Sequence, residues 1–115
     1  MPNQNIQIVT SSGSREGYKI VHVKGALNIH TIFDFQSALR AETSPALIID
    51  FSEVPFIDST GLGAMVGAHL AAQKANRKLV FAAMNTQVKA LLDMTHVSHF
   101  FTTYPTIHDA EAAVS

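Results

Sequence analysis

Apolar and polar residues alternate near the start of the chain, and longer apolar runs follow. Residues 6–10 and 18–24 both alternate, and a Ser/Gly-rich segment at residues 11–14 separates them. A period of two on either side of a turn predicts a β-hairpin. The continuous apolar run at residues 46–51 instead predicts a central strand that is covered on both faces.

Apolar residues recur at helical spacing between and after these strands. Ile32, Phe35 and Leu39 share one helical face. Thr31, with Asp34 three residues later, predicts a capping box at the start of that helix. The remaining predicted elements are a helix over residues 59–75, a strand over 78–84, a helix around 88–92, a strand over 100–104 and a helix from residue 106.

The order β-β-α-β-α-β-α-β-α predicts a mixed sheet packed by helices, in the α/β (α+β) class. A length of 115 residues suits a single domain, over residues 1–115. The absence of cysteine excludes disulfides and thiolate chemistry and favours a cytoplasmic location. A formal net charge of −1 argues against nucleic-acid or anionic-membrane partners. No apolar run approaches the roughly 18 residues of a membrane span.

The candidate chemistry lies where the buried strand at residues 46–51 leads into the predicted helix over residues 59–75. Asp58, Ser59 and Thr60 are all suited to cap that helix, because their side-chain oxygens accept bonds from free first-turn N–H groups. On these residues alone, the segment is interpreted as a helix cap and nothing more.

The predicted helix carries no charged side chain from Ser59 to Gln73, whereas a solvent-facing helix normally carries Lys and Glu. Small residues on its other faces let a second chain approach the backbone closely, so we expect a partner-docking surface with Ser59 at its rim. The alternative is that another element of the same domain packs there. The expected core stripe is Leu62, Met65, Val66, His69 and Leu70, and the expected docking residues are Gly61, Gly63, Ala64, Gly67 and Ala68.

Phosphorylation of Ser59 would control such docking. A phosphate adds about −1.5 to −2 charges, and the helix N-terminus favours it by about 0.3–1 kcal/mol. A partner that covers the site would have to desolvate this group, and an unpaired charge at an interface costs about 2–5 kcal/mol. The phosphate would therefore block docking without unfolding the domain.

The sequence resembles the signature of STAS domains, specifically the anti-sigma factor antagonists. The resemblance rests on Asp-Phe-Ser at residues 50–52 and Phe-Ile-Asp-Ser-Thr-Gly-Leu-Gly at residues 56–63. Weaker matches are Gly-Ala-Leu-Asn at residues 25–28 and the Val-x-x-Leu-Leu-x-Met pattern at residues 88–94. The matches fall in the family's order and cover nearly the whole chain.

The resemblance implies a sheet of four or five strands flanked by about four helices, without enzymatic activity, cofactor or metal. In the family, a serine kinase that is also an anti-sigma factor phosphorylates the serine matching Ser59. The unphosphorylated form binds that kinase and frees the sigma factor, and a PP2C-type phosphatase restores it. Asp58 and Asp50 match family acids beside the acceptor, and we group Thr60 with them as supporting residues.

The chain departs from the family pattern at two places. Ala26 and Asn28 stand where the family often has Glu and Asp, and we count Asn28 among the partner-binding residues. Thr95-His96-Val97 replaces a common Ser/Thr-Gly-Leu after the third predicted helix. Some STAS domains are not phosphorylated, so the alternative is a constitutive assembly module of a stress-signalling or transport complex, in which Ser59 only caps the helix. The low-charge helix also leaves weak homodimerisation open.

Two other constellations are weaker. A Ser-His-Asp hydrolase would need Gly at Ile57, and His69 lies about 15 Å from Ser59 along the helix at 1.5 Å per residue. His96 and His99 are three residues apart, but a metal site needs a third ligand that the sequence does not identify.

Overall fold

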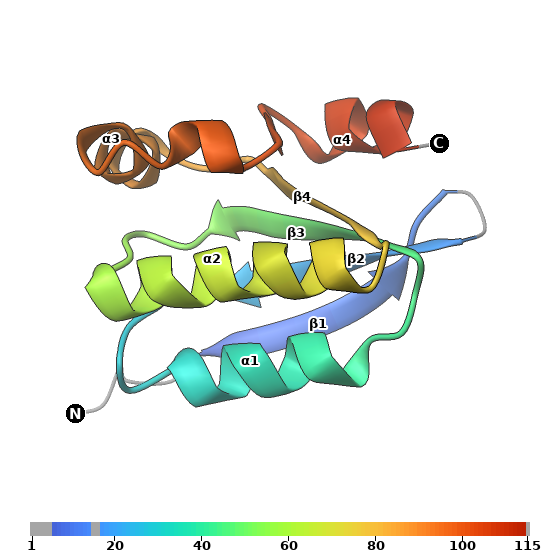
Figure 1. The fold of residues 1–115 in the computed structure, drawn as a ribbon, viewed down its shortest axis with the longest axis horizontal. Helices are drawn as coiled ribbons and strands as arrows, with labels where there is room; N and C mark the ends of the chain where they lie inside the picture. Colours follow the sequence, from blue (N-terminus) through green and yellow to red (C-terminus); the bar gives the residue numbers. More distant parts are fainter. Residues whose placement is uncertain (1–5, 15–16, 115) are drawn as a thin grey trace.

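The protein folds around a five-stranded mixed sheet (Figure 1), as the sequence predicted. The computed structural model describes residues 6–14 and 17–114. The strand order is β1-β2-β3-β4-β5, with β1 antiparallel to β2 and every other neighbouring pair parallel. The strands are β1 (Gln7–Ser12), β2 (Tyr18–Lys24), β3 (Ala46–Glu53), β4 (Lys78–Ala82) and β5 (Thr103–Tyr104).

Helices cover both faces of the sheet, and their order along the chain is the predicted one. They are α1 (Ile32–Ala41), α2 (Ser59–Lys74), α3 (Thr86–Met94) and α4 (Ile107–Val114), with a short 3-10 helix at Ser98–Phe100. No helix in the described part of the chain is both long and apolar enough to cross a membrane.

The alternation of β3 divides the core in two. Leu47, Ile49 and Phe51 belong to the larger buried cluster, which α1, α2 and α3 complete. Ile48 points to the opposite face and belongs to the smaller cluster, with Ala110 of α4. A strand that is buried on both faces explains the continuous apolar run in the sequence.

A carboxylate ties α4 to the β1–β2 hairpin. Glu111 Oε2 accepts the backbone N–H of Ser14 at 2.9 Å and the hydroxyl of Tyr18 at 2.8 Å. The bond from the Ser14 N–H, followed by the Tyr18 hydroxyl, lowers the pKa of Glu111, because both donors favour the charged carboxylate.

Three local predictions were wrong. Thr31 makes no side-chain cap bond to α1, and its hydroxyl instead donates to the carbonyl of Ala26 at 2.8 Å, so the capping box is absent. β4 ends at Ala82 rather than near residue 84, because Ala83 has a positive φ of 64°. The predicted strand over residues 100–104 contains only Thr103–Tyr104, after the 3-10 helix.

α1 and α2 run side by side with their N-terminal ends at the same end of the molecule (Figure 1). The loop between β2 and α1 therefore lies next to the loop between β3 and α2. An isolated parallel bridge between Leu27 and Ile57 joins the two loops directly.

Candidate functional site

Asp58 is the residue that caps α2. Its backbone is extended, and its Oδ1 accepts the N–H of Gly61 at 2.9 Å. Its own carbonyl accepts the N–H of Leu62 at 2.9 Å, which closes the first turn. The sequence offered Asp58, Ser59 and Thr60 as caps, and the structure selects Asp58. The interpretation of Ser59 as the cap is therefore wrong.

The start of α2 is pinned to the β2–α1 loop through backbone contacts with Leu27. The Leu27 N–H donates to the carbonyl of Phe56, and the Asp58 N–H donates to the carbonyl of Leu27, each at 3.2 Å. A Cβ at Gly61 would collide with the Leu27 carbonyl oxygen. Glycine is thus required here by a close backbone approach rather than by an unusual φ.

Ser59 follows the cap and is exposed. No residue in the ranges 6–14 and 17–114 makes a hydrogen bond to its hydroxyl. Thr60 is half-buried. The Ser59 hydroxyl therefore lies at the surface without a partner among the described residues.

Exposed apolar side chains occur in both of the segments that the Leu27–Ile57 bridge joins. Phe56 is 51% exposed and lies three residues before Ser59, while Ile29 and Phe33, from the loop and first turn beside it, are 67% and 69% exposed. We call these three residues the apolar rim. Isolated exposed apolar residues are ordinary, but three on adjoining loops indicate an interaction surface.

Asn28 holds the turn that carries Ile29. Its Oδ1 accepts the N–H of His30 at 2.8 Å, and its N–H donates to the Thr31 hydroxyl at 3.0 Å. Asn28 is half-buried. The expected partner-binding residue thus also has a local structural task.

The predicted docking face of α2 is only partly on the surface. Gly61 and Ala64 are buried, Ala68 is half-buried, and Gly63 and Gly67 are exposed. The predicted core stripe is confirmed at Met65, which is fully buried, and is wrong at Leu70, which is 50% exposed. Much of the small-residue surface therefore faces the domain itself. This corrects the expectation for Gly61 and Ala64, whose burial leaves them little surface to offer a partner.

Asp50 lies on the opposite face of the sheet from α2. It is buried, and its Oδ2 accepts from Nδ1 of His22 at 2.7 Å while Oδ1 accepts the Ser52 N–H at 2.9 Å. The expectation that Asp50 supports the Ser59 site is not reflected in its contacts, which are all made on the α4 face.

A Ser-His-Asp chain on this face escaped the sequence analysis. Ser11 Oγ lies 3.0 Å from Nε2 of His22, which in turn binds Asp50. The three residues come from β1, β2 and β3, and only the strand register, which pairs His22 with Asp50, brings them together. These hydrogen bonds satisfy the buried carboxylate of Asp50, and this structural role accounts for the Ser11–His22–Asp50 contacts.

The remaining histidine candidates lie apart. His96 follows α3 with a positive φ of 60°, and the His99 ring stacks on Phe100 with centroids 5.2 Å apart. Within the described residues, no group of three or more His, Cys, Asp or Glu side chains is placed to hold a metal ion.

Known proteins match both the sequence and this geometry. The STAS domain family model matches residues 6–110, so the chain belongs to that family. Among curated relatives, the anti-sigma-B factor antagonist of Staphylococcus epidermidis is 28% identical over 96 residues, which cover 81% of this chain and 85% of the relative. The anti-sigma-B factor antagonist of Listeria monocytogenes is 29% identical over 87 residues, covering 76% of this chain and 68% of the relative.

Solved structures agree. The crystal structure of an anti-sigma factor antagonist from Mycobacterium paratuberculosis superimposes with a TM-score of 0.85 at 26% identity, covering 98% of this chain and 97% of that one. Phosphorylated SpoIIAA, a cell fate determinant of Bacillus, shares the fold with a TM-score of 0.69 at 13% identity, covering 96% and 99%. The predicted fold class is confirmed, and the chain is placed with the anti-sigma factor antagonists.

Proposed function

We propose that this protein binds an anti-sigma factor serine kinase through the apolar rim and the start of α2, and that phosphorylation of Ser59 by this kinase breaks the complex. Sequestering the kinase frees a sigma factor, and a PP2C-type phosphatase restores the binding form. The protein itself is a cytoplasmic regulator with no enzymatic activity. The observation that carries the proposal is the exposed, unbonded Ser59 hydroxyl beside the rim formed by Ile29, Phe33 and Phe56.

The local charge makes a phosphate at Ser59 an effective block. Residues 25–39 and 54–73, the segments around the site, contain no lysine or arginine. A phosphate would add about −1.5 to −2 charges next to the Asp58 carboxylate. A partner that covers it must supply its own cations or leave the charges unpaired, at about 2–5 kcal/mol.

The fold tolerates the same charge. Ser59 occupies the first turn of α2, where the positive end of the helix dipole and its free N–H groups favour an anion. SpoIIAA, which has the same fold, occurs in both phosphorylated and unphosphorylated forms. The modification therefore acts on the surface and leaves the core intact.

Phosphorylation is tested by incubating the purified protein with its cognate anti-sigma factor kinase and ATP and mapping the phosphate by mass spectrometry. We expect label on Ser59, none in Ser59→Ala, and full label in Thr60→Ala, which removes the adjacent hydroxyl. Label that persists in Ser59→Ala would overturn the assignment.

Binding is tested separately by calorimetry with the unmodified kinase. Ser59→Asp should weaken binding about 30-fold or more, since an unpaired interfacial charge costs at least about 2 kcal/mol. Ser59→Asn introduces a side chain of the size of aspartate without its charge, so its affinity for the kinase should stay much closer to that of the wild type. Phe33→Ser, which removes an exposed side chain of the apolar rim, should weaken kinase binding while the variant still folds.

The alternative is a constitutive assembly module of a stress-signalling or transport complex. The apolar rim favours docking in either case, because it is exposed whether or not Ser59 is modified. Equal affinity of wild type and Ser59→Asp, together with loss of binding in Phe33→Ser, would favour the constitutive module.

A further inference from the structure

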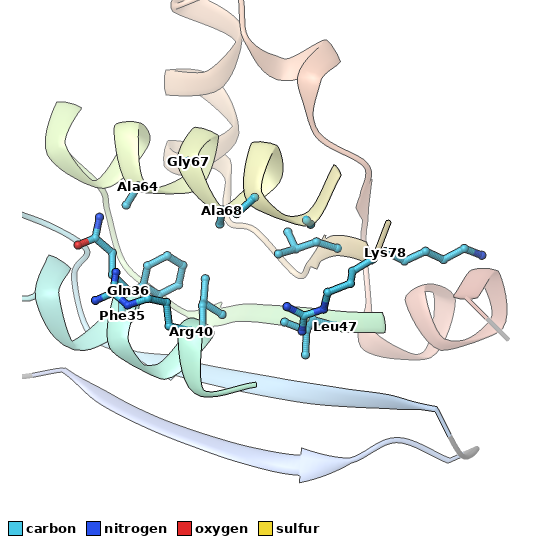
Figure 2. Close-up of a pocket in the computed structure, with 13 residues that line it drawn as sticks. Phe35, Gln36, Arg40, Leu47, Ala64, Gly67, Ala68 and Lys78 are labelled. Carbon is cyan, nitrogen blue, oxygen red and sulfur yellow. The ribbon is translucent and has the colours of Figure 1, made fainter. Parts of the chain in front are cut away.

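A cavity of about 390 Å³ opens between α1 and α2, over the first residues of β3 and β4 (Figure 2). Phe35 and Leu39 of α1 form one wall, and Leu47 of β3 forms the floor. On the α2 side the wall consists of glycine and alanines, whose lack of long side chains leaves the space open: Ala64, Gly67, Ala68, Ala71 and Ala72. A volume of this size lies within the roughly 300–1,000 Å³ of small-molecule sites.

Two arginines line the cavity beside the polar side chain of Gln36. Nε of Arg77 donates to the carbonyl of Ser44 at 2.8 Å, which fixes the guanidinium, while its Nη2 is buried and has no acceptor in the described residues. Arg40 of α1 also lines the cavity, and neither guanidinium forms an ion pair within residues 6–14 and 17–114. Lys78 contributes only its stem, because its side chain runs away from the cavity (Figure 2).

An unsatisfied arginine beside an apolar cavity indicates the chemistry of a ligand. A guanidinium without an anionic partner favours a carboxylate, which accepts charge-assisted hydrogen bonds from it. Nη1 of Arg77 is neither bonded to a described residue nor buried, so it can donate to a carboxylate in the cavity, whereas Nη2 is covered by protein atoms.

The surrounding helix ends favour a single negative charge. The cavity lies along the C-terminal halves of α1 and α2, and each C-terminus carries a partial charge of about −0.5. These partial charges offset part of the charge of Arg40 and Arg77. The positive charge that remains matches a monoanion better than a phosphate dianion. The apolar walls formed by Phe35, Leu39 and Leu47 match an aliphatic chain.

We propose that the α1–α2 cavity binds an aliphatic monocarboxylate, with its carboxylate on Arg77 and Arg40 and its chain between the two helices. Ala64, Gly67 and Ala68 of this cavity were expected on a partner-docking face, but the cavity includes neither the apolar rim nor the first turn of α2. Its α2 residues begin at Ala64, five positions after Ser59 and on the buried side of the helix. The proposal therefore stands or falls independently of the kinase interaction.

The test is calorimetry of the full chain with octanoate, and with octanol and acetate as probes of the two halves of the ligand. We expect octanoate to bind, and octanol and acetate each to bind at least about 10-fold more weakly, the scale set by one charge-assisted hydrogen bond. Arg77→Gln should weaken octanoate binding by about the same factor.

Two glycine variants test the cavity independently, in case Arg77→Gln does not fold. Gly67→Leu should abolish octanoate binding, and Gly63→Leu, one turn earlier on α2 and outside the cavity, should not; a Cβ at either glycine meets nothing within 4 Å. No binding of octanoate to the wild type, equal binding of octanol, or full binding to a folded Gly67→Leu protein would each overturn the proposal.

Discussion

The backbone of Leu27 occupies the space that a side chain at Gly61 would need, so the β2–α1 loop and the first turn of α2 touch without intervening side chains. The same carbonyl oxygen of Leu27 accepts the N–H of Asp58 at 3.2 Å. This contact brings the Ile29 and Phe33 side chains to the same end of the molecule as Ser59.

Gly61→Ala should lower the free energy of unfolding by about 1–3 kcal/mol, because the added methyl overpacks against backbone that cannot rotate away. Gly63→Ala is the matched control, since its Cβ would meet open space. It should raise stability by up to about 1 kcal/mol through helix propensity. Urea denaturation measures both, and equal stability of the two variants would contradict the proposed backbone contact.

Asp58→Ala should cost about 0.5–2 kcal/mol, because the Gly61 N–H loses its acceptor at the start of α2. Ser59→Ala should change stability by no more than about 0.5 kcal/mol, because its hydroxyl has no partner among the described residues. Thermal unfolding of the two variants separates the roles of the neighbouring residues. A larger loss in Ser59→Ala would return the capping role to Ser59.

Asp50→Ala should destabilise the fold by about 1–3 kcal/mol, since it leaves the His22 ring and the Ser52 N–H without their buried acceptor. Ser11→Ala removes only the hydrogen bond between Ser11 and His22 and should lower the free energy of unfolding by less than about 0.5 kcal/mol. Chemical denaturation gives both values. Hydrolysis of p-nitrophenyl acetate that disappears in Ser11→Ala would show instead that these residues are catalytic.

Glu111→Gln should make the free energy of unfolding less dependent on pH in the acidic range. The pKa of Glu111 is lowered in the folded protein, so its contribution is complete above the ordinary glutamate value of 4.5 and is lost as the pH falls through the folded value. Solvent screens this carboxylate, so we expect at most about 1 kcal/mol between wild type and variant at neutral pH. In unfolding curves, the difference in free energy of unfolding between wild type and Glu111→Gln should shrink towards pH 3. Tyr18→Phe, which removes one of the two donors, should show part of the same loss of stability.

His96→Gly should stabilise the protein by about 0.5–1.5 kcal/mol. His96 ends α3 with φ of 60°, and Val97 N–H bonds to the carbonyl of Leu92 across it, which is the glycine position of a Schellman motif. Asn76 occupies the same position after α2 with φ of 56°, and asparagine tolerates it better. Asn76→Gly is therefore the control and should gain less in thermal unfolding.

The sequence predicted most elements because their patterns depend on local spacing. The hairpin and the four helices follow from periods of 2 and 3.6 residues, and β3 follows from its continuous apolar run. Errors arose where backbone conformation decided the outcome. The positive φ of Ala83 shortened β4, and a tertiary bond to Ala26 took the Thr31 hydroxyl away from its helix.

The site was predictable at its centre and not at its edges. Asp58 and Ser59 are neighbours in the sequence, so their position at a helix start needed only local reasoning. The apolar rim joins Phe56 to Ile29 through the Leu27–Ile57 bridge, which no local pattern encodes. The hydrogen-bond partner of Asp50 likewise depends on which strand pairs with β3 and in which register.

The sheet ends differently on its two sides. β5 contributes two residues and pairs only with Phe81 and Ala82 of β4, while β1 presents a six-residue edge strand whose outer N–H and C=O groups are unpaired in the described sheet. Strand addition by a foreign extended peptide, or by another copy in an aggregate, is templated by a long edge rather than a short one. Charged substitutions at the exposed positions of β1, such as Val9, should therefore improve solubility.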